Sequence, residues 1–202
     1  NLLPVDDVVE IMYKCAKALH YAHSRGVIHR DIKPSNLMLT QANDVRIIDF
    51  GIALVSDSEI SRIDGIAGSP SYMSPEQVQS LEITNRSDLY SLGAVMYEML
   101  TGYRPFRGGN LSKLLHQIVY ATAQPIHSLR PEIPEVLENC VAKALHKDPA
   151  KRYRNGLELA AVAEADRTLE PHAADLAHRP RHGRGRAVEA AGRHRLRAEA
   201  VG

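Results

Sequence analysis

The sequence predicts an α+β fold, mainly helical, over residues 1–166, followed by a tail of a different kind over residues 167–202. Apolar residues recur at helical spacing in five stretches, and two short apolar runs flank a polar turn. The composition then changes: residues 167–202 carry 8 arginines, 4 acidic residues and no lysine. We therefore expect one domain at 1–166 and an Arg/Ala-rich, disordered tail.

The first helix is predicted over residues 5–25, because apolar side chains recur every three or four positions until Gly26. Two short strands are predicted at 37–39 and 45–48, joined by a polar turn at 41–44. The residues that define the helical repeat are Val8, Ile11, Met12, Cys15, Leu19 and Ala22.

A second helix is predicted over residues 85–101, and because it is apolar on most faces we expect it to be central. Three further helices are predicted at 111–120, 134–145 and 155–166. Residues 52–67 are polar and show no periodicity, which predicts a loop.

The bulk properties exclude several classes of protein. No run approaches the roughly 20 apolar residues of a membrane span, and no charged-then-apolar leader opens the chain. Cys15 and Cys140 lie within apolar helical patterns, so we expect buried, reduced thiols and a cytoplasmic protein. The tail arginines form no helical stripe and alternate with no aromatic residue, which argues against nucleic-acid binding.

The tail is built from few types of amino acid. From Leu169 onward it uses nine residue types, each of which can be encoded by a codon that begins with G or C. A shifted reading frame in a GC-rich gene is therefore a hypothesis for its origin.

One run of residues contains most of the candidate catalytic groups. His29-Arg30-Asp31-Ile32-Lys33-Pro34-Ser35-Asn36 is followed, thirteen residues after its end, by Asp49-Phe50-Gly51. Asp31 can orient an attacking hydroxyl and accept its proton, and Lys33 can neutralise a migrating phosphoryl group. Asn36 and Asp49 offer the hard oxygen ligands that Mg²⁺ prefers. These groups predict phosphoryl transfer from a metal–nucleotide complex to a hydroxyl.

The same residues resemble a known family, the eukaryotic-type (Hanks-type) serine/threonine protein kinases of the bacterial kind. The run at 29–36 is similar to the family's catalytic loop, and 49–51 to its metal-binding segment. Three further motifs follow in the family's order: Gly68-Ser69-Pro70-Ser71-Tyr72-Met73-Ser74-Pro75-Glu76, Asp88-Leu89-Tyr90-Ser91-Leu92-Gly93, and Lys147-Asp148-Pro149 with Arg152.

The resemblance implies ATP and Mg²⁺ as cofactors and assigns roles to the matching residues. Asp31 and Lys33 would be catalytic, Asn36 and Asp49 would hold the metal and nucleotide, and Met38 would lie beneath the adenine ring. A lysine two residues after Asp31, here Lys33, also resembles the serine/threonine branch of the family. By the same resemblance, Asp88 accepts hydrogen bonds from catalytic-loop amides.

Other matching residues imply regulation and substrate docking. Arg30 would receive a phosphate from an activation loop at 52–67, and the docking segment would depend on an ion pair between Glu76 and Arg152. By the same resemblance, His29 and Phe50 stack in the hydrophobic spine that links the family's two lobes. In an isolated lobe these two residues and Met38 would face solvent. The candidate phosphosites are Ser56, Ser58 and Ser61, and the candidate docking residues are Ser69, Tyr72, Glu76 and Arg152.

Two functions stay open from the sequence. One is an enzyme: the C-terminal lobe of a serine/threonine kinase that phosphorylates protein substrates. Nothing before Asn1 supplies the family's Gly-rich loop or its phosphate-binding Lys, so the chain alone is expected to be weakly active or inactive. The other is a catalytically inactive truncated kinase that acts as a binding module for substrates or regulators. The partners expected are protein substrates and a missing N-terminal lobe or a full-length kinase.

Overall fold

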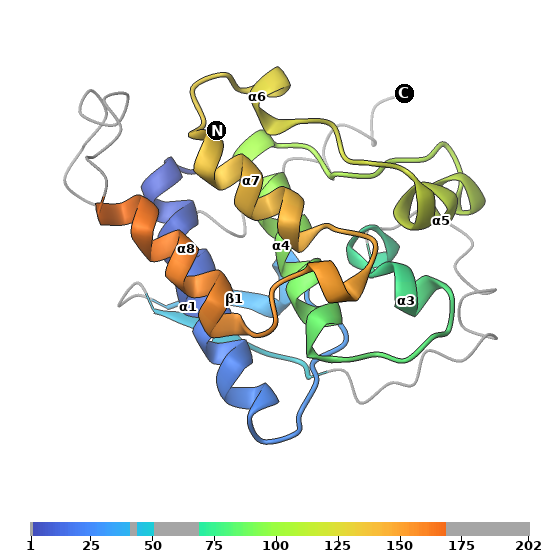
Figure 1. Ribbon diagram of the computed structural model, residues 1–202, viewed down its shortest axis with the longest axis horizontal. Helices are drawn as coiled ribbons and strands as arrows, with labels where there is room; N and C mark the ends of the chain where they lie inside the picture. The colour runs from blue at the N-terminus through green and yellow to red at the C-terminus, as the bar shows by residue number, and fades with distance from the viewer. Residues whose placement is uncertain (1, 41–43, 51–68, 169–202) are drawn as a thin grey trace, which may run out of the picture.

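The computed structural model describes residues 2–40, 44–50 and 69–168. Over these residues the chain is mainly helical, with one two-stranded antiparallel sheet (Figure 1). The predicted fold class is therefore confirmed. The tail beyond Thr168 and the predicted loop at 52–67 lie outside the described residues.

Helix α1 spans Val5–His23 and buries Val8, Cys15 and Leu19 along one face. Asp6 and Asp7 occupy its first turn, where negative charge complements the helix dipole. The predicted helix at 5–25 is slightly too long. The Gly26 amide donates to the His23 carbonyl at 2.9 Å, and Gly26 has φ 74°, so the chain turns away at this point.

The sheet consists of β1, Leu37–Leu39, and β2, Val45–Ile47, paired with Leu37 opposite Ile47. Both strands were predicted. A short turn, η1, Pro34–Asn36, leads into β1, and the Ile48 amide donates to the Asn36 carbonyl at 3.0 Å. This bond extends the pairing past β2 and brings the start of the segment at 49–51 to the end of the catalytic loop.

Helix α4 spans Asn85–Thr101, as predicted, and is buried on nearly every side. A capping box begins it: the Thr84 hydroxyl accepts from the first turn, and the Ser87 hydroxyl bonds back to the Thr84 amide. Gly102, with φ 78°, ends it. The helix contacts α1, α7 and α6, so it is the central element of the lobe.

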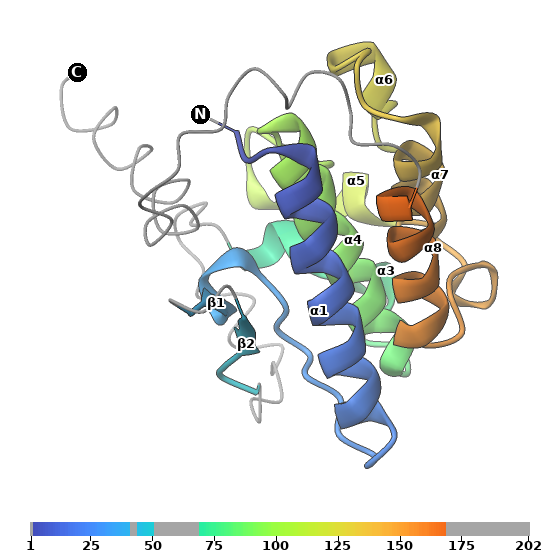
Figure 2. The same ribbon diagram turned by 90° about the vertical axis from the view of Figure 1, so that its left-hand side faces the viewer.

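Three further helices match the prediction: α5, Leu111–Tyr120, α7, Glu135–Ala144, and α8, Gly156–Thr168. Two short helices were not predicted, α3, Pro75–Val78, and α6, Ile126–Leu129. Figure 2 shows the sheet on one side of α1 and α8 on the other, and both make direct contact with α1.

The core lies among α1, α4, α7 and α8. Cys15 and Cys140 are both buried thiols, as expected, and burial raises the pKa of Cys15 to about 12. Within the described ranges, none of the helices has the length and apolar character needed to cross a bilayer.

Candidate catalytic site

The backbone of the catalytic loop is held by one carboxylate from the first turn of α4. Asp88, which is buried, accepts the His29 amide at Oδ2 and the Arg30 amide at Oδ1, both at 2.8 Å. The Nε2 atom of His23, in the last turn of α1, lies 2.7 Å from the same Oδ2. The expectation that Asp88 accepts from catalytic-loop amides is therefore confirmed.

The His29 ring joins the loop to the end of β2. Its Nδ1 accepts the Asp31 amide at 3.2 Å, so Nε2 carries the proton and donates to the Ile48 carbonyl at 2.9 Å. The Phe50 ring covers it, with the ring centroids 4.6 Å apart. The expectation that His29 faces solvent is wrong, because these contacts bury it completely. Phe50 and Met38 are exposed, at 41% and 51%.

Asp31, Lys33 and Asn36 converge in a polar cluster on the loop. Lys33 Nζ lies 2.6 Å from Asp31 Oδ2, and Asn36 Nδ2 donates to the Asp31 carbonyl at 2.8 Å and to Oδ2 at 3.1 Å. The Asp31 side chain is still 40% exposed. The carboxylate is thus oriented from two sides while it stays accessible to a hydroxyl from outside.

Asp49 directly follows the backbone bond that joins Ile48 to Asn36. It has φ 56°, a left-handed conformation that is uncommon for a residue with a side chain, and it is exposed. Asn36 directs its amide nitrogen to Asp31, which leaves the amide oxygen for another partner; Ser35 Oγ lies 3.4 Å from it.

The donor set fits Mg²⁺ by its chemistry. Asn36 Oδ1 and the Asp49 carboxylate are hard oxygen ligands, and Mg²⁺ is usually held by one or two such groups together with water and substrate phosphates. In the described part of the chain, no three His, Cys, Asp or Glu residues are grouped as a metal cage.

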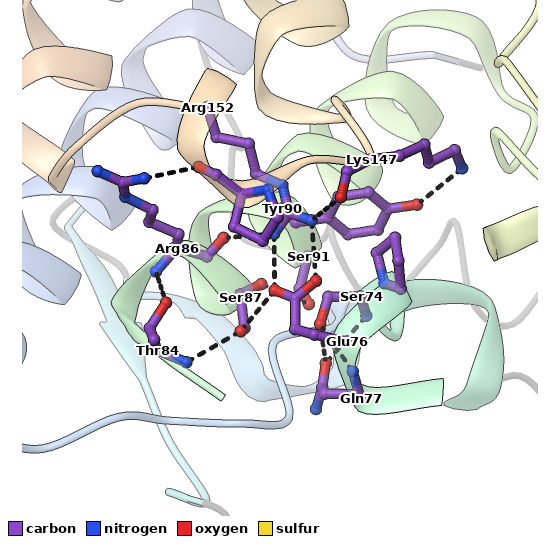
Figure 3. Close-up of polar contacts among 12 residues, drawn as sticks. Ser74, Glu76, Gln77, Thr84, Arg86, Ser87, Tyr90, Ser91, Lys147 and Arg152 are labelled. Carbon is purple, nitrogen blue, oxygen red and sulfur yellow. Dashed lines mark hydrogen bonds and ion pairs between the residues drawn. The ribbon is translucent and has the colours of Figure 1, made fainter. Parts of the chain in front are cut away.

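A buried ion pair fixes the segment that carries Glu76 (Figure 3). Arg152 donates Nη1 to Glu76 Oε1 at 2.7 Å and Nη2 to Oε2 at 2.8 Å, and Ser87 Oγ donates to Oε1 at 2.7 Å. Burial favours a higher pKa for Glu76, but the bonds from Arg152 and Ser87 outweigh it and lower the pKa. The ion pair expected from the sequence is present.

The Arg152 guanidinium has three more hydrogen bonds, all to backbone carbonyls. Nε donates to His146 at 2.6 Å, Nη1 to Arg86 at 3.1 Å and Nη2 to Lys147 at 3.0 Å. Its carbon centre also lies 4.8 Å from the centre of the Tyr90 ring. Every donor of the guanidinium is thus engaged, and one side chain joins α3, α4 and the turn η3, Pro149–Lys151.

Tyr72 lies in the turn η2, Ser69–Tyr72, and its hydroxyl donates to Glu98 Oε2 at 2.5 Å. Burial and the Glu98 charge raise the pKa of Tyr72. The backbone of Ser69 begins this turn. The structure thus places Tyr72 against α4, next to the segment that carries Glu76.

The remaining expectations concern regulation. Arg30 has φ 69°, and its carbonyl accepts the Gln77 side-chain amide at 2.7 Å, which ties the catalytic loop to α3. Ser56, Ser58 and Ser61 lie outside the described residues, as does Gly51.

Two residues that contribute to this region were not predicted: His23 bonds to Asp88, and Gln77 joins α3 to the catalytic loop. Lys147, which was named only as part of a motif, reaches the last turn of α5. A signal existed for Gln77, because Ser74 and Gln77 have the spacing of a capping box, and the structure contains one. For His23 the local pattern gave none.

The comparisons with known proteins agree with this geometry. A family model described as a protein kinase domain matches residues 1–161. The chain belongs to the protein kinase family.

The particular relatives are bacterial serine/threonine-protein kinases. The chain is 40% identical over 158 residues to a probable serine/threonine-protein kinase of Clostridium perfringens, covering 78% of this chain and 23% of the relative. It is 37% identical over 161 residues to the serine/threonine-protein kinase PknB of Mycobacterium leprae, covering 79% of this chain and 26% of the relative. The chain thus spans about a quarter of the length of these curated relatives.

Solved structures show the same fold. The crystal structure of the Mycobacterium tuberculosis PknI kinase domain superposes with a TM-score of 0.62 at 29% identity. The match covers 82% of this chain and 57% of that chain. The described residues therefore correspond to a part of a kinase domain.

Proposed function

We propose that this chain is the C-terminal, catalytic lobe of a serine/threonine protein kinase, with the lobe itself at residues 1–166. In the intact enzyme it transfers the γ-phosphate of ATP to serine or threonine residues of protein substrates. One observation carries the proposal: Lys33 and Asn36 both contact Asp31, on a loop whose backbone is held by Asp88.

The roles follow from the contacts. Asp31 orients the acceptor hydroxyl and takes its proton, and Lys33 offsets negative charge beside it. Asn36 and Asp49 would hold Mg²⁺, which when bound neutralises charge on the nucleotide phosphates. Met38, exposed on β1, provides an apolar surface for the adenine ring. Positioning by fixed groups supplies most of the catalysis in such a site.

Regulation and docking form a second part of the proposal. Arg30 receives a phosphate from Ser56, Ser58 or Ser61 through charge-assisted hydrogen bonds. The segment from Ser69 through Tyr72 to Glu76, fixed by Arg152, positions the protein substrate. Support comes from the buried ion pair and from the bond of Tyr72 to Glu98.

The intact enzyme also requires an N-terminal lobe as a partner. An apolar pocket of about 450 Å³ lies between the end of α1 and the sheet. Its lining includes Tyr21, Val27 and Phe50, exposed at 61%, 44% and 41%. The matched crystal structure extends well beyond the part that this chain covers. We assign this pocket to the remainder of the kinase domain, and expect the chain alone to be weakly active or inactive.

A cytoplasmic location belongs to the same proposal, because ATP is available there. The buried thiols of Cys15 and Cys140 support a reducing compartment.

The test is a phosphorylation assay on two forms of the protein. One is the chain alone, and the other is the chain fused behind the N-terminal part of the Clostridium relative's kinase domain. We expect radiolabel from ATP to enter a basic protein substrate only with the fusion, and Asp49→Ala to abolish it. Asp44→Ala, at an exposed carboxylate just before β2, is the matched control. Equal incorporation with Asp49→Ala would rule the proposal out.

A binding module is the second candidate. The exposed apolar pocket favours it, since such surfaces mark interaction sites. Substrate capture by the fusion with no phosphate incorporated would support this candidate over the enzyme.

A further inference from the structure

We infer that Arg104 is a specificity-determining residue, which selects protein substrates with an acidic side chain close to the acceptor hydroxyl. The inference deepens the proposed kinase function and rests on it for the identity of the substrate. Arg104 lies in the connection between α4 and α5, outside the motifs that define the candidate catalytic site. Its guanidinium adds a positive charge beside the proposed docking segment, residues 69–76.

The Arg104 side chain is held against the start of this segment. Nη1 donates to Ser71 Oγ at 3.2 Å, and the central carbon of the guanidinium lies 5.7 Å from the centre of the Tyr72 ring. Ser71 is itself buried. The guanidinium is therefore positioned before a substrate binds, which lowers the entropy cost of a contact with it.

Glu98, at the end of α4, only partly balances this charge. Its Oε1 lies 3.8 Å from Arg104 Nε, which is within ion-pair range but too long for a hydrogen bond. Its Oε2 accepts the Tyr72 hydroxyl at 2.5 Å. Arg104 Nε is buried and has no hydrogen-bond partner among the described residues. The donors of the guanidinium are thus not all engaged by this part of the chain.

The local charge favours an anion. Residues 98–107 carry two arginines and one acidic residue. The Arg104 side chain is 20% exposed, so a group from outside can reach it while much of its surroundings is protein. An opposite charge is attracted more strongly at such a partly buried position than in open water. A guanidinium also fits a carboxylate or a phosphate with parallel hydrogen bonds.

The position of Arg104 relative to Asp31 follows from contacts already described. The Gln77 side chain, directly after the docking segment, donates to the Arg30 carbonyl at 2.7 Å, and Asp31 is the next residue. Ser71 belongs to the same segment. A substrate chain that presents its hydroxyl to Asp31 and runs along this segment therefore passes Arg104 within a few residues of the acceptor.

The first test is peptide binding to the whole chain, followed by NMR. The peptides share one serine in a neutral sequence, and a single aspartate, lysine or phosphoserine is moved through the positions on both sides of it. At one position, or at neighbouring ones, we expect aspartate to tighten binding about threefold to tenfold and to shift the Arg104 Nε signal. Lysine at the same position should weaken binding, and the phosphoserine peptides distinguish a phosphate from a carboxylate ligand.

Three variants test the residue itself. With Arg104→Gln we expect the gain from aspartate to disappear and lysine to become the preferred residue, because Glu98 is left without its partner. Arg104→Lys should keep part of the gain, since it keeps the charge. Arg107→Gln is the matched control: Arg107 lies on the same connection but faces the Tyr103 ring, 4.8 Å from its centre, and we expect the gain to remain.

Equal binding of the aspartate and neutral peptides at every position overturns the inference. An equal loss with Arg104→Gln and Arg107→Gln also overturns it, because the effect would then be one of general charge. Thermal unfolding shows whether each variant is folded. If Arg104→Gln is not, the shift of the wild-type Nε signal and the binding by Arg104→Lys give the result.

A second measurement uses the fusion with the N-terminal part of the Clostridium relative's kinase domain. We expect the favoured aspartate to lower KM about threefold to tenfold with little change in kcat, and Arg104→Gln to remove that difference. A fusion that phosphorylates none of the peptides contradicts the proposed kinase function. Phosphorylation with equal KM for the aspartate and neutral peptides contradicts the role of Arg104 alone.

Discussion

At the scale of the residue, Arg152 makes a set of hydrogen bonds that only an arginine side chain could make. Its planar fork matches both oxygens of Glu76, and its remaining donors are taken by three carbonyls. Lysine has a single ammonium and cannot reproduce this arrangement. The position of the segment that carries Glu76 therefore depends on the shape of the guanidinium as well as on its charge.

We expect Arg152→Met to lower the free energy of unfolding by roughly 3–5 kcal/mol, because Glu76 is left charged and buried without its partner. Arg152→Lys should recover only part of this loss. Urea denaturation of the whole chain measures both. Adding Glu76→Gln to Arg152→Met should restore stability, since it removes the uncompensated charge; a double variant less stable than Arg152→Met would contradict this account.

Lys147 is a second residue with a specific environment. Its ammonium bonds to the carbonyls of Ile118 and Gln117 and lies 3.8 Å from the centre of the Phe106 ring. Burial, with a smaller effect from the Arg152 charge, lowers the pKa of Lys147 to about 8. The side chain thus supports the last turn of α5, where it donates to the Ile118 carbonyl and adds a second donor to the Gln117 carbonyl, which also accepts the Ala121 amide.

The lowered pKa predicts a pH dependence of stability. Between pH 8 and 10.5 the unfolded chain retains the Lys147 proton while the folded chain releases it, so this residue makes the free energy of unfolding rise with pH. Urea denaturation across this range should show the rise in the wild type relative to Lys147→Met. A ¹³C NMR titration of Lys147 with a midpoint near 10.5 would refute the prediction.

At the scale of the element, α4 and α7 pack closely against each other at Gly93. A Cβ placed there would lie 2.7 Å from the Ala144 Cβ, closer than two such atoms can pack. The glycine is a poor helix former, and its presence at the centre of α4 is explained by this contact.

Gly93→Ala should therefore destabilise the chain by about 1–3 kcal/mol, although alanine favours the helix. The double variant Gly93→Ala with Ala144→Gly should recover most of the loss, because the clash is removed. Gly109→Ala, where the added Cβ meets no atom within 4 Å, is the control. Thermal unfolding measures all three, and a stabilised Gly93→Ala would show that the two helices can separate.

Helices of ten or more residues could be predicted from the sequence, whereas the one-turn helices could not. Helices α4 and α5 have the predicted bounds because their apolar repeat runs over several turns between clear breaks. Helices α3 and α6 are one turn long, so no periodicity can develop. The Ser74–Gln77 capping box was the one local sign of α3.

At the scale of the whole molecule, the candidate site is assembled from distant segments. Residues 65 positions apart meet in the His23–Asp88 bond, and 76 positions separate Glu76 from Arg152. The sequence named Asp88, Glu76 and Arg152 only through the family resemblance, because local pattern carries no information about such distances. His23 matched none of the motifs and was missed.

The exposed pocket between α1 and the sheet is also a property of the whole molecule. We expect Val27→Lys, on its rim, to reduce the fluorescence of the apolar dye ANS bound to the chain, because a charge disrupts the apolar surface. Tyr120→Lys, at a residue 71% exposed that does not line this pocket, is the control. Equal dye binding by all three proteins would mean that the pocket is not an accessible apolar site.

The packing of α8 along α1 has a consequence for synthesis on the ribosome. Helix α1 is covered on one side by α8, the last described helix, so this part of its apolar face stays bare until nearly the whole lobe has been translated. Glu76 likewise has no Arg152 to pair with until position 152 has been translated. A nascent lobe of this kind is expected to engage chaperones until translation passes α8.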